Sequence, residues 1–253
     1  MNISVGSLLG RGMLAGLLAG LPALAVAYLL GEGPIDSAIA YEDGHLAAHG
    51  MGGEEELVSR ALQSTAGLAT GVLVTAVALG GIAALVYAFA LGRIGRFGPR
   101  ATALLLSGAA FTAIGLVPFL KYPANPPAAN DAETINTRTA LFFLMVALSI
   151  LLAVAATILG RRLAPRLGNW NATLAAGLAF VVAVGVAYAA LPAVSETPED
   201  FPATVLWQFR VASLAIQLTL WASFGLVFGH FAERLINPVA RAVRATEQPA
   251  PAA

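Results

Sequence analysis

Metal-ligating side chains gather in one short segment of the sequence. Carboxylate oxygens and imidazole nitrogens are ligands for divalent first-row metal ions. Glu42, His45 and His49 are three and four residues apart, so on a helical turn they would share one face. We therefore predict capture of a divalent ion by Glu42, Asp43, His45, His49, Glu54, Glu55 and Glu56.

Two other interpretations of this segment stay open. Gly44, Gly50, Gly52 and Gly53 weaken a helix, so a flexible loop that closes around an ion fits the residues equally well. The segment could also be a solvated acidic loop, in which the carboxylates at 54–56 favour the start of the next helix through its dipole. Imidazole suits cobalt, nickel, copper and zinc, so the ligand types do not identify the metal.

Three further polar residues are candidates for a path through the protein. Lys121 and Asn125 lie in a segment that three prolines make stiff, which suits a shaped mouth or a tight turn. Gln217 lies within a long apolar stretch, where an amide requires partners and often forms an interhelical hydrogen bond. We predict that Lys121, Asn125 and Gln217 line the substrate path.

Enzyme chemistry has little support in the sequence. The chain has no Cys, and it carries neither a Walker A motif, an H-E-x-x-H motif nor a G-x-S-x-G motif. The 14 basic residues balance the 14 acidic ones, which argues against nucleic acid as a partner. We predict no enzymatic activity and no resident cofactor.

The elements that must position these residues are membrane-spanning helices. Hydrophobic residues make up 58% of the 253 residues and charged residues only 11%, which excludes an ordinary soluble domain. Long apolar stretches without Asp, Glu, Lys or Arg must satisfy their backbone internally, as α-helices do. An all-α polytopic protein follows, a single transmembrane domain over 1–236 with six spans at 12–30, 68–91, 101–120, 139–159, 172–191 and 211–231.

Charge asymmetry predicts the orientation of these spans. If the connections alternate, one side receives 10 of the 14 basic residues and the other side 12 of the 14 acidic ones. Basic residues near span ends are retained in the cytoplasm. We expect both termini inside, acidic loops outside, a disordered cytoplasmic Pro/Ala-rich tail at 237–253, and a multi-pass location in the inner (plasma) membrane of the cell. A competing interpretation takes the first span as a signal peptide with an A-x-A site at 25–27.

Small residues and arginines suggest how the spans pair. Gly12, Gly16 and Gly20 recur at every fourth residue, as at a close helix interface, and the same spacing occurs at Gly67/Gly71 and Gly225/Gly229. Each outward connection returns through an arginine, at Arg60, Arg138 and Arg210. The pattern predicts three helical hairpins in parallel, whose outer loops converge on one acidic vestibule that attracts cations.

The chain resembles the CbtA family, the predicted membrane subunit of a cobalt transporter. The resemblance runs almost end to end and is carried by RGMLAG at 11–16, IDSAIAYE at 35–42, EEELVSR at 54–60, VPFLKYPANPP at 117–127, ETI at 133–135, RTAL at 138–141 and LWQFR at 206–210. It implies cobalt uptake for cobalamin synthesis, together with a small single-span companion subunit that bears histidines. We therefore expect a membrane subunit of a divalent metal uptake transporter, with a non-transporting structural or metal-sensing protein as the alternative.

Overall fold

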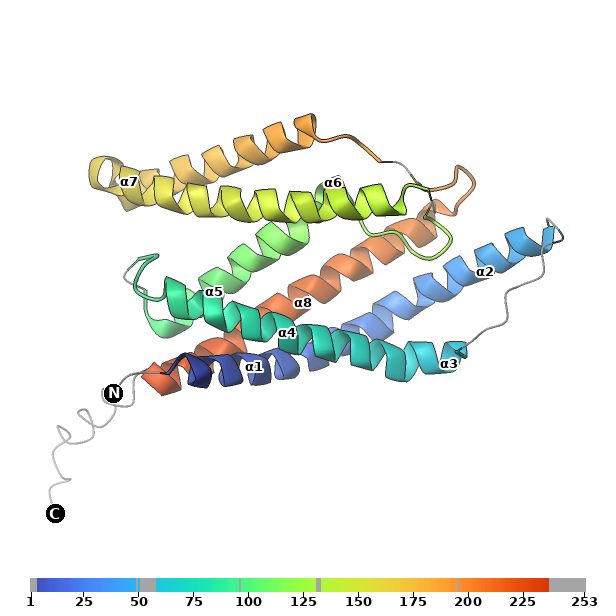
Figure 1. Ribbon diagram of the computed structural model, residues 1–253, viewed down its shortest axis with the longest axis horizontal. Helices are drawn as coiled ribbons and strands as arrows, with labels where there is room; N and C mark the ends of the chain where they lie inside the picture. Colours follow the sequence, from blue (N-terminus) through green and yellow to red (C-terminus); the bar gives the residue numbers. More distant parts are fainter. Residues whose placement is uncertain are drawn as a thin grey trace, which may run out of the picture. The chain divides into compact units, whose positions relative to one another are not determined.

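Helices make up nearly all of the regular structure. The computed structural model describes residues 4–48, 50, 58–95, 97–130, 133–194 and 196–236, and no strand occurs among them. The expectation of an all-α protein is confirmed for this part of the chain. The expected tail at 237–253 lies outside the described residues. The helices are α1 Val5–Val26, α2 Glu32–Ala48, α3 Arg60–Leu62, α4 Leu68–Ala90, α5 Pro99–Ala110, α6 Val117–Lys121, α7 Ile135–Ala190 and α8 Ala203–Ile236 (Figure 1).

Wide π-helical turns join several of these helices into longer ones. They are η1 Ala27–Gly31, η2 Gln63–Gly67 and η3 Phe111–Leu116. Two of them end shortly before prolines: η1 ends at Gly31, before Pro34, and η3 ends at Leu116, before Pro118. Proline cannot donate a backbone hydrogen bond. A π-turn changes the hydrogen-bond register locally, so the helix continues past the missing donor. The chain is therefore helical up to Ala48. The sequence had instead suggested a loop that begins soon after residue 30.

Five helical elements of the described chain are long and apolar enough to cross a bilayer: Val5–Ala48, Arg60–Ala90, Pro99–Lys121, Ile135–Ala190 and Ala203–Ile236. Their number differs from the six expected stretches because α7 contains two of them, 139–159 and 172–191. A straight helix of 56 residues would be about 84 Å long, far more than the hydrocarbon thickness of a membrane.

A break at Gly168 folds α7 back on itself. Gly168 has φ 74° and ψ 162°, a conformation that favours glycine, and Pro165 precedes it. The two legs then lie side by side (Figure 1), and a Cβ added to Gly160 would lie 3.2 Å from Cβ of Ala176. In the ribbon α7 is thus a helical hairpin rather than one rod.

The chain divides into two compact units. The first consists of the described residues of Met1–Pro22, Thr70–Gly108 and Thr219–Ala253. In this unit Tyr87 is buried, packs edge-on against Phe228 with ring centroids 5.0 Å apart, and donates a hydrogen bond to the Pro99 carbonyl at 3.2 Å. Arg100 forms an ion pair with Glu233 and contacts His230.

Glycines set the closest helix contacts of the first unit. α1 and α4 meet where Gly12 and Gly16 face Gly80, and a Cβ on any of the three would collide with the backbone of the other helix. Gly225 of α8 likewise lies against Ser107 of α5. The expected small-residue contacts are confirmed at these positions. They are wrong at Gly67/Gly71, because Gly71 has nothing within 4 Å and Gly67 meets only its own helix.

The second unit consists of the described residues of Ala23–Ala69 and Ala109–Leu218. One of its clusters buries Val117, Tyr122, Met145 and Val184, so it joins α6 to both legs of α7. A second cluster buries Ala38, Ala129 and Phe201. These three residues come from the three connections that the sequence placed on one side of the membrane. The three connections therefore pack against one another through a small hydrophobic core.

Candidate functional site

The end of α2 carries the predicted metal ligands that the structure describes. Glu42, Asp43 and His45 are exposed and lie on the last two turns of this helix. Glu42 and His45 are three residues apart and therefore share a face, as the helical interpretation of the segment requires. The other predicted ligands, His49, Glu54, Glu55 and Glu56, lie outside the described residues.

His45 meets a carboxylate that the sequence analysis did not select. Its Nε2 lies 2.8 Å from Oδ2 of Asp200, in the connection between α7 and α8. Both side chains are about half exposed, 46% for His45 and 60% for Asp200. The contact spans 155 residues of sequence, so spacing could not reveal it. A cluster of three or more His, Cys, Asp or Glu side chains able to hold a metal is not found among the described residues.

Tyr41 orients this pair. A hydrogen bond from Tyr41 is the largest cause that lowers the pKa of Asp200 below its ordinary value. Desolvation opposes it, and the contact with His45 lowers the pKa further. The Tyr41 ring also contacts the His45 ring, with centroids 4.5 Å apart, and meets Phe201 edge-on at 5.0 Å. Asp200 is therefore ionised at neutral pH and fixed beside an imidazole, which makes the pair an acceptor for a cation or a proton.

Arg60, Arg138 and Arg210 lie where the three outward connections return to a helix, and each binds polar groups of those connections. Arg60 forms ion pairs with Glu32 and with Asp36, the latter at 2.9 Å, and so ties α3 to α2. This single positive charge offsets one of the two negative charges that Glu32 and Asp36 bring to the vestibule. The recurrence of the arginines is visible in the sequence, but their partners are not.

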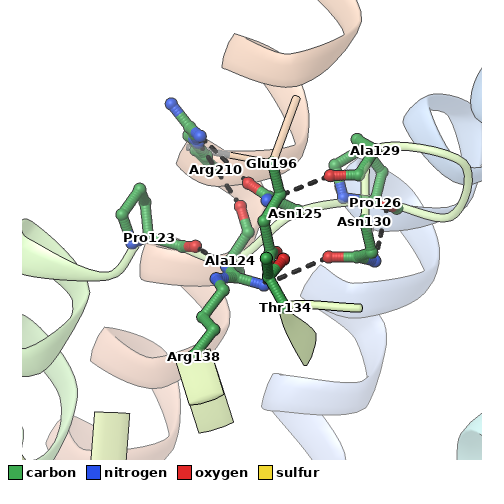
Figure 2. Close-up of polar contacts among 10 residues, drawn as sticks. All are labelled: Pro123, Ala124, Asn125, Pro126, Ala129, Asn130, Thr134, Arg138, Glu196 and Arg210. Carbon is green, nitrogen blue, oxygen red and sulfur yellow. Dashed lines mark hydrogen bonds and ion pairs between the residues drawn. The ribbon is translucent and has the colours of Figure 1, made fainter. Parts of the chain in front are cut away.

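Arg138 and Arg210 hold the proline-rich segment between α6 and α7 (Figure 2). Arg138 donates hydrogen bonds to the Pro123 carbonyl and, at 3.1 Å, to Oδ1 of Asn130. Arg210 donates to the Ala124 carbonyl at 3.4 Å and to Oδ1 of Asn125 at 3.0 Å. Backbone carbonyls that prolines leave without helical partners are satisfied in this way.

Glu196 is the buried counter-charge of this arginine pair. Its side chain is fully buried, accepts a hydrogen bond from Thr134 at 2.7 Å, and lies 3.2 Å from Nη1 of Arg138 (Figure 2). Arg210 has no carboxylate partner among the ion pairs of the described residues. The neighbourhood therefore carries an excess of positive charge.

Lys121 and Asn125, predicted to line the path, both serve local structure. Lys121 Nζ donates to the Tyr188 carbonyl at 2.9 Å and so satisfies the carboxyl end of α7. Asn125 Nδ2 donates to the Ala129 carbonyl at 3.1 Å, while its oxygen accepts from Arg210. Both side chains are thus engaged within the protein.

Gln217 faces a cavity of about 450 Å³ in the second unit. Apolar side chains from η3, α6, α7 and α8 form much of the wall. The polar part of the lining comprises Tyr122, Arg138, Thr139, Ser213 and Gln217. Of the three predicted path residues, Gln217 lines this cavity and Lys121 and Asn125 do not.

The long apolar helices define a multi-pass membrane protein. A family model described as "Probable cobalt transporter subunit (CbtA)" matches residues 5–233, and the chain belongs to this family. The resemblance seen in the sequence is thereby confirmed. No curated protein and no solved structure matches the chain.

Proposed function

We propose that this chain is the membrane subunit of a Co²⁺ uptake transporter that captures the ion at the exposed end of α2. The description of the family as a probable cobalt transporter subunit supports the substrate. The observation that carries the capture site is the contact between His45 and Asp200, which joins an imidazole and an ionised carboxylate at an exposed position. These are ligand types that suit Co²⁺ and similar ions.

In this proposal the capture site extends beyond the pair. Glu42 and Asp43 supply carboxylates from the same helix end, and His49 and Glu54–Glu56 supply further ligands from the adjoining segment. Asp200 joins the set as a ligand from the third connection. A bound dication would replace the hydrogen bond between His45 and Asp200, because both atoms would then coordinate the metal.

The proposed topology has six spans with both termini inside, so that the capture site faces outward. The fold-back of α7 at Gly168 supports two spans within that element. Arg161, Arg162 and Arg166 precede the turn, and basic residues near span ends favour the cytoplasmic side.

Energy and passage across the membrane involve a partner in this proposal. The six apolar stretches contain no carboxylate and so no relay that could couple a proton gradient to transport. The proposed partner is a small single-span subunit that bears histidines and receives the ion. The cobalt delivered would serve cobalamin synthesis.

Cellular cobalt content tests the proposal. A deletion strain is complemented with the wild type, with a His45→Ala/His49→Ala variant, or with His230→Ala, a matched control whose histidine contacts Arg100. We expect wild type and His230→Ala to restore cobalt and the double variant to restore less than a third of it, since two of the ligands are lost. Equal restoration by all three would remove His45 and His49 from the mechanism.

Vesicles distinguish transport from binding alone. Uptake of Co²⁺ is measured in vesicles that contain the chain with and without its companion subunit. We expect uptake only when both are present. Tight Co²⁺ binding without uptake in either case would favour a metal-sensing or structural protein.

A further inference from the structure

The cavity beside Gln217 has the wrong charge for a bare metal ion. Arg138 contributes to its lining, and Arg210 binds the carbonyl of Ala124, another lining residue. The guanidinium of Arg210 also experiences the positive charge of Arg138. Among the ion pairs of the described residues, one carboxylate, Glu196, pairs with Arg138, and none pairs with Arg210.

Polar groups with spare hydrogen-bonding capacity face this space. The Gln217 amide lines the cavity and takes part in none of the hydrogen bonds found among the described residues. Arg138 uses Nη1 and Nη2 for its protein contacts, which leaves Nε–H without a partner among them. An amide at the depth of an apolar helix requires a partner, and a guanidinium prefers an anionic oxygen.

We propose that the cavity binds an anion whose carboxylate or phosphate group lies at Arg138 and whose second polar group reaches Gln217. The volume of about 450 Å³ is in the usual range for small-molecule sites. Phe119, Phe142 and Leu214 enclose the part of the anion between its polar ends. This site is separate from the capture site at His45, and it goes beyond the proposed function.

Two sources could supply such a group: a soluble organic acid or the headgroup of an anionic phospholipid. The full chain is reconstituted in nanodiscs of phosphatidylcholine in metal-free buffer, and citrate binding is measured by calorimetry. In a second arm the chain is purified from phosphatidylglycerol-containing membranes, and retained lipid is measured by native mass spectrometry. Binding of citrate identifies the soluble source, and retention of phosphatidylglycerol identifies the lipid source.

Gln217→Leu is the informative variant because Gln217 has no hydrogen bond that the fold would lose. We expect citrate affinity or lipid retention to fall about tenfold, as for the loss of one hydrogen bond to a charged ligand. Gln208→Leu, on an exposed position of the same helix, is the matched control and should bind as the wild type does. Higher salt should weaken the binding of citrate.

Two results would overturn the proposal. One is the absence of both citrate binding and lipid retention in the wild type. The other is equal binding by wild type and Gln217→Leu. Melting temperatures within a few degrees of the wild type show that each variant is folded, and Arg138→Lys, which keeps the charge but loses the planar fork, gives a second weakened variant.

Discussion

At the scale of single residues, the outward connections are held by side chains that bind main-chain oxygens. Lys121, Arg138 and Arg210 each donate to a carbonyl of a segment distant in sequence or rich in proline. Such contacts satisfy acceptors that helix ends and prolines leave open. These contacts also explain why basic residues occur in the outward connections, which were predicted to form an acidic vestibule that attracts cations.

Loss of the Glu196 carboxylate should destabilise the protein. Glu196→Ala leaves the partly buried Arg138 without its counter-charge, and we expect the free energy of unfolding to fall by about 2–3 kcal/mol. Chemical denaturation in detergent measures the change. Glu199→Ala, an exposed acid of the same segment, should change it by less than about 0.5 kcal/mol. A Glu196→Ala protein as stable as Glu199→Ala would show that the pair contributes nothing.

Tyr122 should make stability depend on alkaline pH. Burial raises the pKa of Tyr122, whose hydroxyl donates to the Pro192 carbonyl at 2.8 Å. The unfolded chain loses this proton near pH 10 while the folded chain keeps it, so stability falls as the pH rises above about 10.

The Tyr122→Phe variant separates the two contributions. We expect it to be less stable at pH 7 by about 1 kcal/mol, the usual value of one hydrogen bond, and to lose less stability than the wild type between pH 9 and pH 11. Thermal melts over this range test the expectation. Parallel pH curves for both proteins would contradict it.

At the scale of helices, close approach depends on a few glycines. The contact of α1 with α4 requires the absence of a Cβ at Gly16, whereas Gly71 on α4 has open space around it. The same glycine spacing thus has different consequences at the two positions.

A pair of alanine substitutions should therefore act in opposite directions. Gly16→Ala forces the two helices apart and should lower the free energy of unfolding by about 1–3 kcal/mol. Gly71→Ala meets no neighbour and should raise it by about 0.5–1 kcal/mol, because alanine loses less conformational entropy in a helix. Denaturation of both variants tests the prediction, and a stable Gly16→Ala protein would show that the interface tolerates a methyl group.

Sequence and structure agree best where local pattern determines the element. Apolar stretches predicted the helices. The spacing of Gly12 and Gly16 predicted a close contact of α1 with another helix, because residues four apart lie on the same helix face. The extension of helix to Ala48 was missed because π-turns such as η1 have no clear sequence signal. The partners of His45 and Arg138 were missed because Asp200 and Glu196 are remote in sequence, and only tertiary structure brings them close.

At the scale of the whole molecule, topology is open to a direct test because the chain contains no cysteine. Single cysteines at Asn169, beside the α7 turn, and at Glu199, before α8, should react with a membrane-impermeant maleimide from opposite sides. We expect labelling of Glu199→Cys in intact cells and of Asn169→Cys only after lysis, since six spans place the two connections on different sides. Labelling of Asn169→Cys in intact cells would exclude the proposed topology.

The arginine contacts also have a consequence for biosynthesis. Arg60 finds Glu32 and Asp36 within the first seventy residues, so the amino-terminal part can close while the ribosome is still translating. The carbonyl of Ala124 and the side chain of Asn125 obtain their hydrogen-bond donor only when Arg210 has been synthesised, about 85 residues later. A chain that ends before α8 would expose unsatisfied acceptors at 124–125, and we expect it to be degraded faster than the full chain.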